Sequence, residues 1–323
     1  MSKKLLFIYN MHSGKGMIRE KLADIIDIFT QGGFDVIAHP TQAVGDATKF
    51  VKDYAAMCDC VVCSGGDGTL DEVVDGVMDT VPDLPVGYIP AGSTNDFANS
   101  LAIPRDMLQA ARDIVLGDLY QCDVGAFNDK FFTYVAAFGM FTNVSYETDQ
   151  TLKNNLGHLA YLLQAGKEVF RIPSYHLVIQ VDGRRIEGNY TYGMITNTRV
   201  VGGMRNLTGN SVDMNDGLFE VTLVRTPTNP IEVNEIVQNL LNITENTSAF
   251  VDKLKARRIE IDSSEEIAWT LDGEYGDSHN HIIIENCHKK LNLYLNRRNK
   301  TYPDQNSAGE KHGSVNLSSI FDI

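Results

Sequence analysis

The stretch Gly65–Asp75 reads GGDGTLDEVVD and decides the fold of the N-terminal half. It follows an apolar run, Cys60–Cys63, and leads directly into helical spacing. Glycine-rich turns between a strand and a helix bind phosphate through backbone N–H groups. Asp67 in such a turn would repel an anion unless a cation lay between them. The stretch therefore predicts a nucleotide site in which Asp67 acts through Mg²⁺ that the nucleotide carries.

Residues 1–126 alternate between strand-like and helix-like segments. The strands are short and apolar without alternation, as in sheets that helices cover on both faces. This order predicts a doubly wound, mostly parallel α/β nucleotide-binding domain over 1–126. The expected strands are 5–9, 34–38, 60–63 and 86–89, and the expected helices are 17–30, 43–54, 70–78, 95–101 and 107–116.

Strand-like segments dominate after Asp123, which predicts a C-terminal antiparallel β-sandwich domain over 127–300. The segment 181–185, VDGRR, carries the Asp-Gly signal of a tight hairpin. From Thr301 to Ile323 the chain is polar and is expected to be a tail. The expected strands are 131–135, 175–181, 188–196, 219–225, 256–261, 267–271, 281–284 and 291–295, and the expected helices are 156–170 and 234–241.

Composition limits the function classes. An apolar fraction of 43% is enough for packed cores, and the formal net charge of −14 argues against nucleic acid as a partner. No apolar run approaches the ~18 residues of a transmembrane helix. The first ten residues, MSKKLLFIYN, are expected to form a strand rather than a signal peptide, which favours a cytoplasmic protein.

Two basic segments, 253–258 and 289–300, are either solvated charge or a surface for transient contact with an anionic membrane. The five cysteines are an odd number, which argues against a disulfide framework. Three of them, Cys58, Cys60 and Cys63, lie in or beside an apolar strand with no second Cys or His pair nearby, so we expect buried thiols rather than a metal site.

Three polar loops follow expected parallel strands: 10–16 (NMHSGKG), 64–69 (SGGDGT) and 90–96 (PAGSTND). Ligands of open parallel sheets bind beyond the carboxyl ends of the strands. Each loop also precedes a helix whose N-terminus offers free N–H groups. The first loop matches neither the Walker A nor the GxGxxG pattern. Each loop alone could be ordinary turn chemistry, but together they predict a nucleotide site.

The segments GGDGTLDEVVDG and PAGSTNDFANSL together resemble the lipid kinase branch of the NAD kinase and diacylglycerol kinase superfamily, the family with the diacylglycerol kinase catalytic domain. The resemblance extends to about residue 298. Three positions depart from the common family pattern. Met11 stands in place of a Pro, Ser93 precedes Thr94 at a small-residue position, and Asn99 stands where an Arg is frequent.

The resemblance implies which residues contact the nucleotide and its Mg²⁺. They are Asn10, Ser13, Gly14, Lys15, Thr41, Gly65, Gly66, Asp67, Gly68, Thr69, Glu72, Thr94, Asn95 and Asp96. Asp96 has a second interpretation as the N-terminal cap of a helix, and the two roles are compatible.

The resemblance also implies a structural Mg²⁺ in the turn 212–218, VDMNDGL. Asp216 would bind it by its side chain, and Asp213 and Leu218 by backbone oxygens. The alternative interpretation is a simple hairpin turn, since Asn-Asp-Gly favours turns. Asp123 matches an acidic position that the family uses near the metal and nucleotide.

A second turn, 269–274, reads WTLDGE and carries two carboxylates, Asp272 and Glu274. In the family such an acidic pair lies over the nucleotide loops, and one member takes the proton from a lipid hydroxyl. The sequence does not separate the two. Apart from this pair, phosphoryl transfer needs mainly positioning and Mg²⁺.

The sequence thus predicts a lipid kinase, peripheral at the membrane, that moves the γ-phosphate of ATP to a lipid hydroxyl, with diacylglycerol as the expected acceptor and phosphatidic acid as the product. ATP would bind the first domain and the lipid the second, where 134–141 (YVAAFGMF) is either an acyl path or ordinary core. Two alternatives remain: an NAD kinase-like phosphotransferase and a nucleotide-binding regulator without turnover. A homodimer is expected from general frequency alone.

Overall fold

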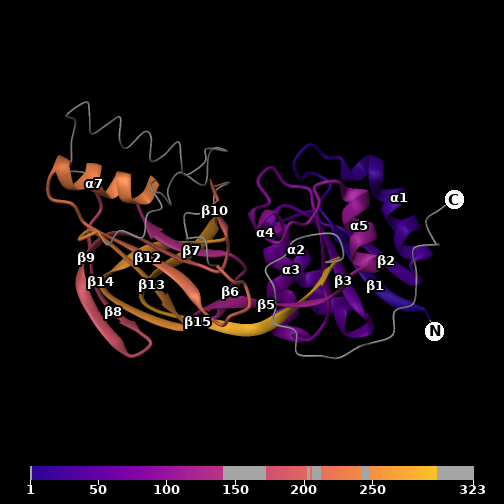
Figure 1. The fold of residues 1–323 in the computed structure, drawn as a ribbon. Coiled ribbons are helices and arrows are strands. Elements are labelled where there is room, and N and C mark those ends of the chain that lie inside the picture. Colours follow the sequence, from indigo (N-terminus) through magenta and orange to yellow (C-terminus); the bar gives the residue numbers. More distant parts are fainter. Residues whose placement is uncertain (1, 141–171, 202–203, 206–211, 242–247, 297–323) are drawn as a thin grey trace. The chain divides into compact units, whose positions relative to one another are not determined.

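The computed structural model describes residues 2–140, 172–201, 204–205, 212–241 and 248–296 (Figure 1). The chain divides into two compact units. The first contains Met1–Gln121 together with the end of the last strand from Asn292, and the second contains Cys122–Leu291. Among the described residues, no helix is both long and apolar enough to cross a bilayer.

The first unit is built on a parallel sheet in the order β4-β3-β1-β2. The strands are β1 (Lys3–Tyr9), β2 (Phe34–Pro40), β3 (Cys60–Gly65) and β4 (Val86–Pro90). The end of β15 (Glu274–Leu295) adds to this sheet, since Leu293 pairs in parallel with Val86 of β4. Apart from the exposed Lys3 and Lys4, the residues of β1, β3 and β4 are buried, as their apolar runs predict.

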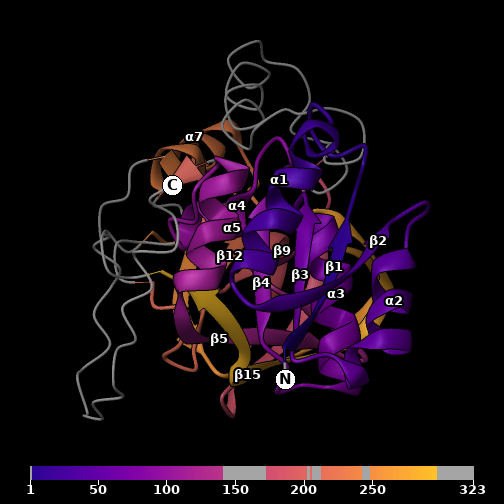
Figure 2. The same cartoon turned by 90° about the vertical axis from the view of Figure 1, so that its right-hand side faces the viewer.

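Helices cover both faces of this sheet (Figure 2). The helices are α1 (Ile18–Gln31), α2 (Asp46–Tyr54), α3 (Asp67–Thr80), α4 (Asp96–Ser100) and α5 (Met107–Leu116), with a short 3₁₀ turn, η1 (Ala55–Met57). On one face α1 and α5 pack together against Leu5, Phe7 and Tyr9 of β1. The helices α2 and α3 contact each other. This is the expected doubly wound arrangement.

The second unit is antiparallel. Its strands follow the order β13-β12-β9-β7-β14-β15, while β8 pairs with β9 and β14, and β5 pairs with β15 and β6. The bounds of the remaining elements are β5 (Asp118–Phe127), β6 (Lys130–Phe132), β7 (Val135–Gly139), β8 (Tyr175–Val181), β9 (Arg184–Thr196), β10 (Val200–Val201), β11 (Met204–Arg205), β12 (Phe219–Arg225), β13 (Val251–Ala256), β14 (Arg258–Leu271) and α7 (Pro230–Leu241).

Two tight hairpins shape this unit. Asp182 and Gly183, both with positive φ, connect β8 to β9, which confirms the expected turn in VDGRR. Asp272 and Gly273, also with positive φ, connect β14 to β15. The core between the strands contains the fully buried Trp269, whose ring lies 4.8 Å from that of Phe138.

The fold class is confirmed, and the differences concern element bounds. Two long strands take the place of four expected ones. The strand β14 joins the expected strands 256–261 and 267–271, and β15 joins 281–284 and 291–295. The strands β5 and β13 were not expected. The expected helix 156–170 lies outside the described residues. The boundary at residue 126 falls inside β5, and the end of β15 belongs to the first unit because it pairs with β4.

The cysteines of β3 are buried thiols, as expected. Cys60 and Cys63 lie in β3 and are fully buried, and burial raises the pKa of Cys60 to about 12. The thiol is therefore protonated at neutral pH and acts as a small apolar side chain.

The contact between Gly193 of β9 and Phe138 of β7 yields a test of the core. A Cβ at Gly193 would lie 2.1 Å from the Phe138 ring, which the ring of Trp269 holds in place. We expect Gly193→Ala to lower the free energy of unfolding by about 1–3 kcal/mol through overpacking. The matched control is Gly188→Ala in the same strand, where the nearest atom is the end of the Arg225 side chain at 3.1 Å. Urea denaturation of both variants measures the difference, and equal stabilities would contradict the prediction.

Candidate active site

The three loops that the sequence singled out lie at one edge of the parallel sheet. The strands β4, β3 and β1 are neighbours, so their carboxyl ends place the loops side by side. Backbone hydrogen bonds link them. The Asn10 N–H donates to the Ser64 carbonyl at 2.8 Å, and the Ala91 N–H donates to the Gly65 carbonyl at 2.7 Å.

Glycines allow these loops to touch. Gly14 has a φ of +54°, and a Cβ there would lie 2.3 Å from the Ala91 carbonyl oxygen. A Cβ at Gly92 would lie 2.7 Å from the Gly66 Cα. The Ser13 hydroxyl accepts a hydrogen bond from the Gly66 N–H at 3.2 Å. The loops therefore form one surface of closely approaching backbone, of the kind that admits phosphate groups.

Two aspartates, Asp67 and Asp96, lie where the second and third loops meet. Asp67 is the first residue of α3, and its Oδ2 accepts a hydrogen bond from the Asp96 N–H at 3.1 Å. Asp96 is almost fully buried. Asn95, rather than Asp96, is the N-cap residue of α4, and it has a left-handed φ of 53°. Its side chain exchanges two hydrogen bonds with the backbone of Gly92, which fixes the third loop.

The donor set suits a Mg²⁺–nucleotide. Carboxylate oxygens are the ligands that Mg²⁺ prefers, and the N-terminus of α3 attracts phosphate. One polar atom near these loops is buried without a partner: the Ser64 Oγ makes no hydrogen bond among the described residues. The loops thus offer both oxygen ligands and room for close approach.

The other expected nucleotide residues lie at or near these loops, with one exception. Thr41 is buried, and its N–H donates to the Tyr9 carbonyl at 3.0 Å, at the base of the first loop. Thr94 is exposed in the third loop, and Lys15 is exposed in the first. Gly68 and Thr69 belong to the first turn of α3.

The exception is Glu72, whose side chain reaches another element. Its Oε1 accepts a hydrogen bond from the Gly45 N–H at 2.8 Å, and its Oε2 accepts one from the Ala47 N–H at 3.0 Å. These donors belong to the N-terminus of α2, so Glu72 caps a neighbouring helix. In this structure the side chain ties α3 to α2.

Tyr88 was not anticipated from the sequence. It is buried in β4, and its hydroxyl contacts the Gly65 carbonyl at 3.2 Å and the Asn95 Oδ1 at 3.3 Å. It thereby joins the second and third loops. Burial, and next the nearby Asp67 carboxylate, raise the pKa of Tyr88, so the hydroxyl stays protonated and can donate. A tyrosine two residues before the third loop, inside an otherwise apolar strand, was the signal available.

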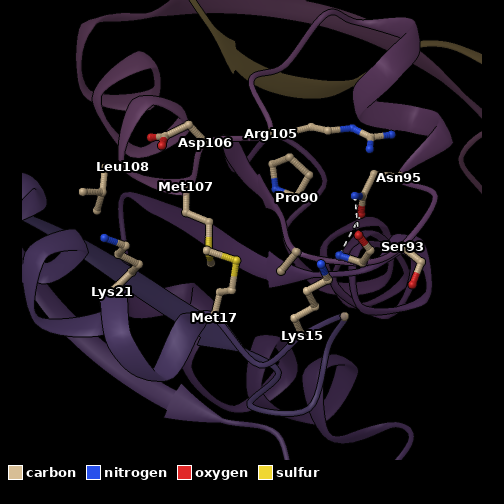
Figure 3. Close-up of a pocket in the computed structure, with 13 residues that line it drawn as sticks. Lys15, Met17, Lys21, Pro90, Ser93, Asn95, Arg105, Asp106, Met107 and Leu108 are labelled. Carbon is tan, nitrogen blue, oxygen red and sulfur yellow. Dashed lines mark hydrogen bonds between the residues drawn. The ribbon is translucent and has the colours of Figure 1, made fainter.

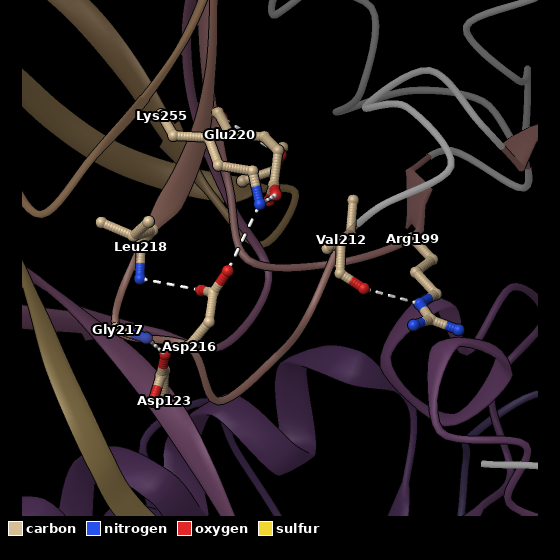
Figure 4. A network of polar contacts seen from close by, with 9 residues as sticks. Asp123, Arg199, Val212, Asp216, Gly217, Leu218, Glu220 and Lys255 are labelled. Carbon is tan, nitrogen blue, oxygen red and sulfur yellow. Dashed lines mark hydrogen bonds and ion pairs between the residues drawn. The ribbon is translucent and has the colours of Figure 1, made fainter. Parts of the chain in front are cut away.

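Asp123 is fully buried in the second unit and organises the turn 212–218. Its Oδ2 accepts a hydrogen bond from the Gly217 N–H at 2.7 Å (Figure 4). Its Oδ1 accepts from the Lys289 N–H at 2.7 Å and lies 3.0 Å from the His288 Nδ1. The carboxylate therefore anchors this turn to β15.

The turn 212–218 carries a second polar network, shown in Figure 4. Asp216 accepts a hydrogen bond from the Leu218 N–H at 3.0 Å, and its other oxygen lies 3.3 Å from the Lys255 Nζ. Lys255 also lies 3.1 Å from the Glu220 Oε1. Carboxylate oxygens are suitable Mg²⁺ ligands, but the Lys255 ammonium already contacts the carboxylates of both Asp216 and Glu220. A divalent ion at Asp216 would require Lys255 to turn away.

The hairpin 271–274 separates the two acids that the sequence left equivalent. Asp272 is buried, and its carboxylate accepts hydrogen bonds from the N–H groups of Thr133, Tyr134 and Val135 and from the Thr133 hydroxyl. Glu274 is exposed. Asp272 therefore holds the hairpin to the start of β7, while the Glu274 side chain is accessible to a ligand.

The position of Glu72 gives a first prediction for this site. We expect Glu72→Gln to lower the free energy of unfolding by about 1–2 kcal/mol, because one of two charge-assisted bonds to α2 is lost. The affinity for Mg-ATP should change little. Thermal unfolding and calorimetric titration measure the two effects, with the exposed Asp24→Asn on α1 as the control. Loss of Mg-ATP affinity at unchanged stability would instead support the nucleotide role implied by the resemblance.

Glu220 gives a prediction for pH dependence. Burial raises the pKa of Glu220 to about 7, and the ion pair with Lys255 only partly opposes this shift. Since the folded-state pKa lies above the ordinary value of 4.5, the contribution of Glu220 to stability is fully present below pH 4.5 and is lost as the pH rises through 7. The loss amounts to roughly 3 kcal/mol at most.

We therefore expect Glu220→Gln to gain stability relative to the unchanged protein between pH 5 and pH 8. Urea denaturation in EDTA at both pH values measures this difference without metal. Glu266→Gln, at an exposed position of β14, is the control. A difference between Glu220→Gln and the unchanged protein that stays constant with pH would contradict the assignment.

Comparisons with known proteins agree with the two units. Residues 4–127 match the model of the diacylglycerol kinase catalytic domain, and residues 135–282 match that of the YegS C-terminal NAD kinase beta sandwich-like domain. The chain is 34% identical to a diacylglycerol kinase of Bacillus subtilis over 278 residues, which cover 85% of this chain and 90% of that one. It is 31% identical to a diacylglycerol kinase of Staphylococcus saprophyticus over 278 residues, with the same coverage.

Solved structures show the same fold. A putative diacylglycerol kinase from Bacillus anthracis superposes with a TM-score of 0.77 at 23% identity, covering 92% of this chain and 98% of that one. Another structure of a putative diacylglycerol kinase from this organism gives a TM-score of 0.74 at 25% identity, covering 91% and 98%. With its glycine loops, its two domain matches and these relatives, the chain belongs to the diacylglycerol kinase family of lipid kinases.

Proposed function

We propose that this protein transfers the γ-phosphate of ATP to the hydroxyl group of diacylglycerol, giving phosphatidic acid. The observation that carries the proposal is the contact of three glycine loops around Asp67 and Asp96 at one edge of the parallel sheet. The names of the relatives supply the acceptor. The protein would act where its lipid substrate is, at the membrane surface.

The first unit would bind the nucleotide. Backbone N–H groups of the loops and the Lys15 ammonium would bind the phosphates, and Asn10, Ser13 and Thr94 would orient them. Asp67 and Asp96 would hold Mg²⁺. When bound, Mg²⁺ neutralises charge on the phosphates during transfer. Thr41 would lie beside the nucleotide, as the resemblance implies.

The second unit would bind the lipid and supply the base for its hydroxyl group. The acceptor hydroxyl must lose a proton as it attacks the phosphate, and the Asp272 and Glu274 pair offers the carboxylates for this step. Asp272 already accepts four hydrogen bonds in the hairpin, whereas Glu274 is exposed. We propose that both carboxylates are needed. Asp272 fixes the geometry of the hairpin, and one of the two carboxylates takes the proton.

With the Lys255 ammonium turned away from Asp216, the turn 212–218 would hold a structural Mg²⁺ through the Asp216 side chain and the backbone oxygens of Asp213 and Leu218. Asp123 would support this turn through its bond to Gly217. A second candidate acceptor is NAD, because the domain model that matches 135–282 is described as NAD kinase beta sandwich-like. The two acceptors differ in solubility, so one assay separates them.

That assay measures transfer of labelled γ-phosphate from Mg-ATP. The acceptors are diacylglycerol, a sphingoid base and phosphatidylglycerol in mixed micelles, and NAD in solution. We expect label in diacylglycerol, and we expect Asp67→Asn to lower kcat by at least about 100-fold because Mg²⁺ loses a ligand. Asp79→Asn, at the exposed end of α3, is the matched control and should keep full activity.

Label that enters only NAD would assign the chain to the second candidate. An Asp67→Asn variant with near-normal kcat would contradict the role of Asp67.

The acidic hairpin gives a further prediction. We expect Asp272→Asn to lower both kcat and the free energy of unfolding, the latter by about 1–3 kcal/mol, because a buried acceptor becomes an amide facing backbone donors. Glu274→Gln, on the same hairpin but exposed, should keep the stability unchanged, so any loss of kcat there reports on chemistry. Thermal unfolding and kcat measured over pH give both readouts. Full activity of both variants would exclude this hairpin from the reaction.

A further inference from the structure

The cavity of the first unit adjoins the candidate active site. It has a volume of about 640 Å³, and Gly14, Lys15 and Asn95 of the nucleotide loops line it. Lys21 and Arg105 lie at opposite ends of this cavity in Figure 3, so they do not converge on one ligand group. A different group of side chains, in the second unit, does converge on one point.

Three side chains with metal-ligating atoms meet on the second unit. Glu260 and Asp262 belong to β14, and His281 belongs to the neighbouring strand β15. One carboxylate oxygen of each acid and one ring nitrogen of the histidine all lie within 4.8 Å of one another. Within the described part of the chain, no other group of three or more His, Cys, Asp or Glu side chains has its ligand atoms so close together.

The pairing of the two strands brings these side chains together. Ile259 and Ile261 are buried in the core, so Glu260 and Asp262, which alternate with them, lie on the opposite face of the sheet. Asp262 is paired with His281 across the antiparallel ladder, and side chains of such a pair are direct neighbours. The strand backbones therefore position all three side chains.

The contacts within the group leave room for an ion. The His281 Nδ1 lies 2.7 Å from the Asp262 Oδ1, and both side chains are about half exposed, at 50% and 49%. A hydrogen bond of this kind carries a proton, which metal binding would displace. The Arg258 Nη1 lies 2.9 Å from the Glu260 Oε2. Because a carboxylate has two oxygens, an ion bound at Oε1 would leave this ion pair in place.

One nitrogen and two carboxylate oxygens favour a particular kind of ion. Imidazole suits Zn²⁺ and other transition metals, whereas Mg²⁺ prefers oxygen ligands alone. Zn²⁺ also accepts three protein ligands and keeps a fourth position for water. Ligand atoms about 2.0–2.2 Å from Zn²⁺ lie roughly 3–4 Å from one another. The three side chains would therefore need only small rotations to bind it.

We propose that Glu260, Asp262 and His281 bind Zn²⁺, which links β14 to β15 across the sheet. The ion would bind where the regular pairing of these strands ends, because the register shifts between Asp262 and Ile267. A link at this point would stabilise the second unit. None of the three residues is among those implied for Mg²⁺ or the nucleotide, so the site is separate from the proposed kinase reaction.

The test measures Zn²⁺ binding to the full chain by competition with a chromophoric chelator. Loss of a residue that merely orients a metal ligand costs about 10–100-fold in affinity. We therefore expect His281→Gln and Asp262→Asn, which each remove a ligand, to weaken Zn²⁺ binding by at least about 10-fold. Zn²⁺ should also raise the unfolding temperature of the unchanged protein, because it binds the folded state, and should not do so for His281→Gln.

His176→Gln is the matched control. The His176 Nε2 lies 3.4 Å from the Glu187 Oε1, so this is another exposed histidine and carboxylate pair on neighbouring strands of the same unit. It belongs to no group of three such ligands among the described residues. The control should keep its Zn²⁺ affinity within about 2-fold. Thermal unfolding in EDTA confirms that each variant is folded.

Unchanged Zn²⁺ affinity in His281→Gln and Asp262→Asn would overturn the site, and so would an equal loss in His176→Gln. Displacement of Zn²⁺ by millimolar Mg²⁺ would overturn the choice of a transition metal. Since none of these measurements involves phosphoryl transfer, failure of the proposed kinase reaction would leave their result unaffected.

Discussion

The candidate active site depends on the close approach of two glycine backbones, at Gly66 and Gly92. A Cβ at Gly92 would lie 2.7 Å from the Gly66 Cα, closer than two non-bonded carbon atoms approach in proteins. This contact brings the start of α3 against the start of α4, and so allows the Asp96 N–H to reach the Asp67 carboxylate. The parallel sheet places the loops at one edge, but the lack of a side chain at Gly66 and Gly92 determines how closely the loops approach.

The second unit uses two buried carboxylates and one exposed carboxylate to hold its turns. Asp123 accepts hydrogen bonds from the backbone N–H groups of Gly217 and Lys289, and Asp272 accepts three from residues 133–135, which lead into β7. Asp182 does the same for the turn that leads into β14. Two of these three acids were selected from the sequence as functional by resemblance. In this fold a conformational role and a chemical role can therefore coincide, and loss of activity on substitution does not by itself separate them.

The sequence predicted the elements whose pattern is local. The apolar runs of β1, β3 and β4 and the bounds of α5 followed from composition and periodicity, because burial on both faces leaves little ambiguity. The strands β5 and β13 escaped because polar residues interrupt them. The long β14 was read as two strands because its middle, 262–266, is polar where its pairing with β15 shifts in register. The partners of Glu72 lie 25 and 27 residues away, and no local pattern encodes such a contact.

Charge explains why the cations near the loops matter in so acidic a protein. Both ATP and an anionic lipid are repelled by a net charge of −14 at long range. Salt screens such repulsion beyond about 8 Å at physiological ionic strength, so the side chains within that distance decide the local potential. Lys15, Lys21 and Arg105 lie around one cavity beside the nucleotide loops. An anion that reaches this edge of the sheet therefore meets local attraction, whereas Asp67 and Asp96 admit phosphate only together with a cation.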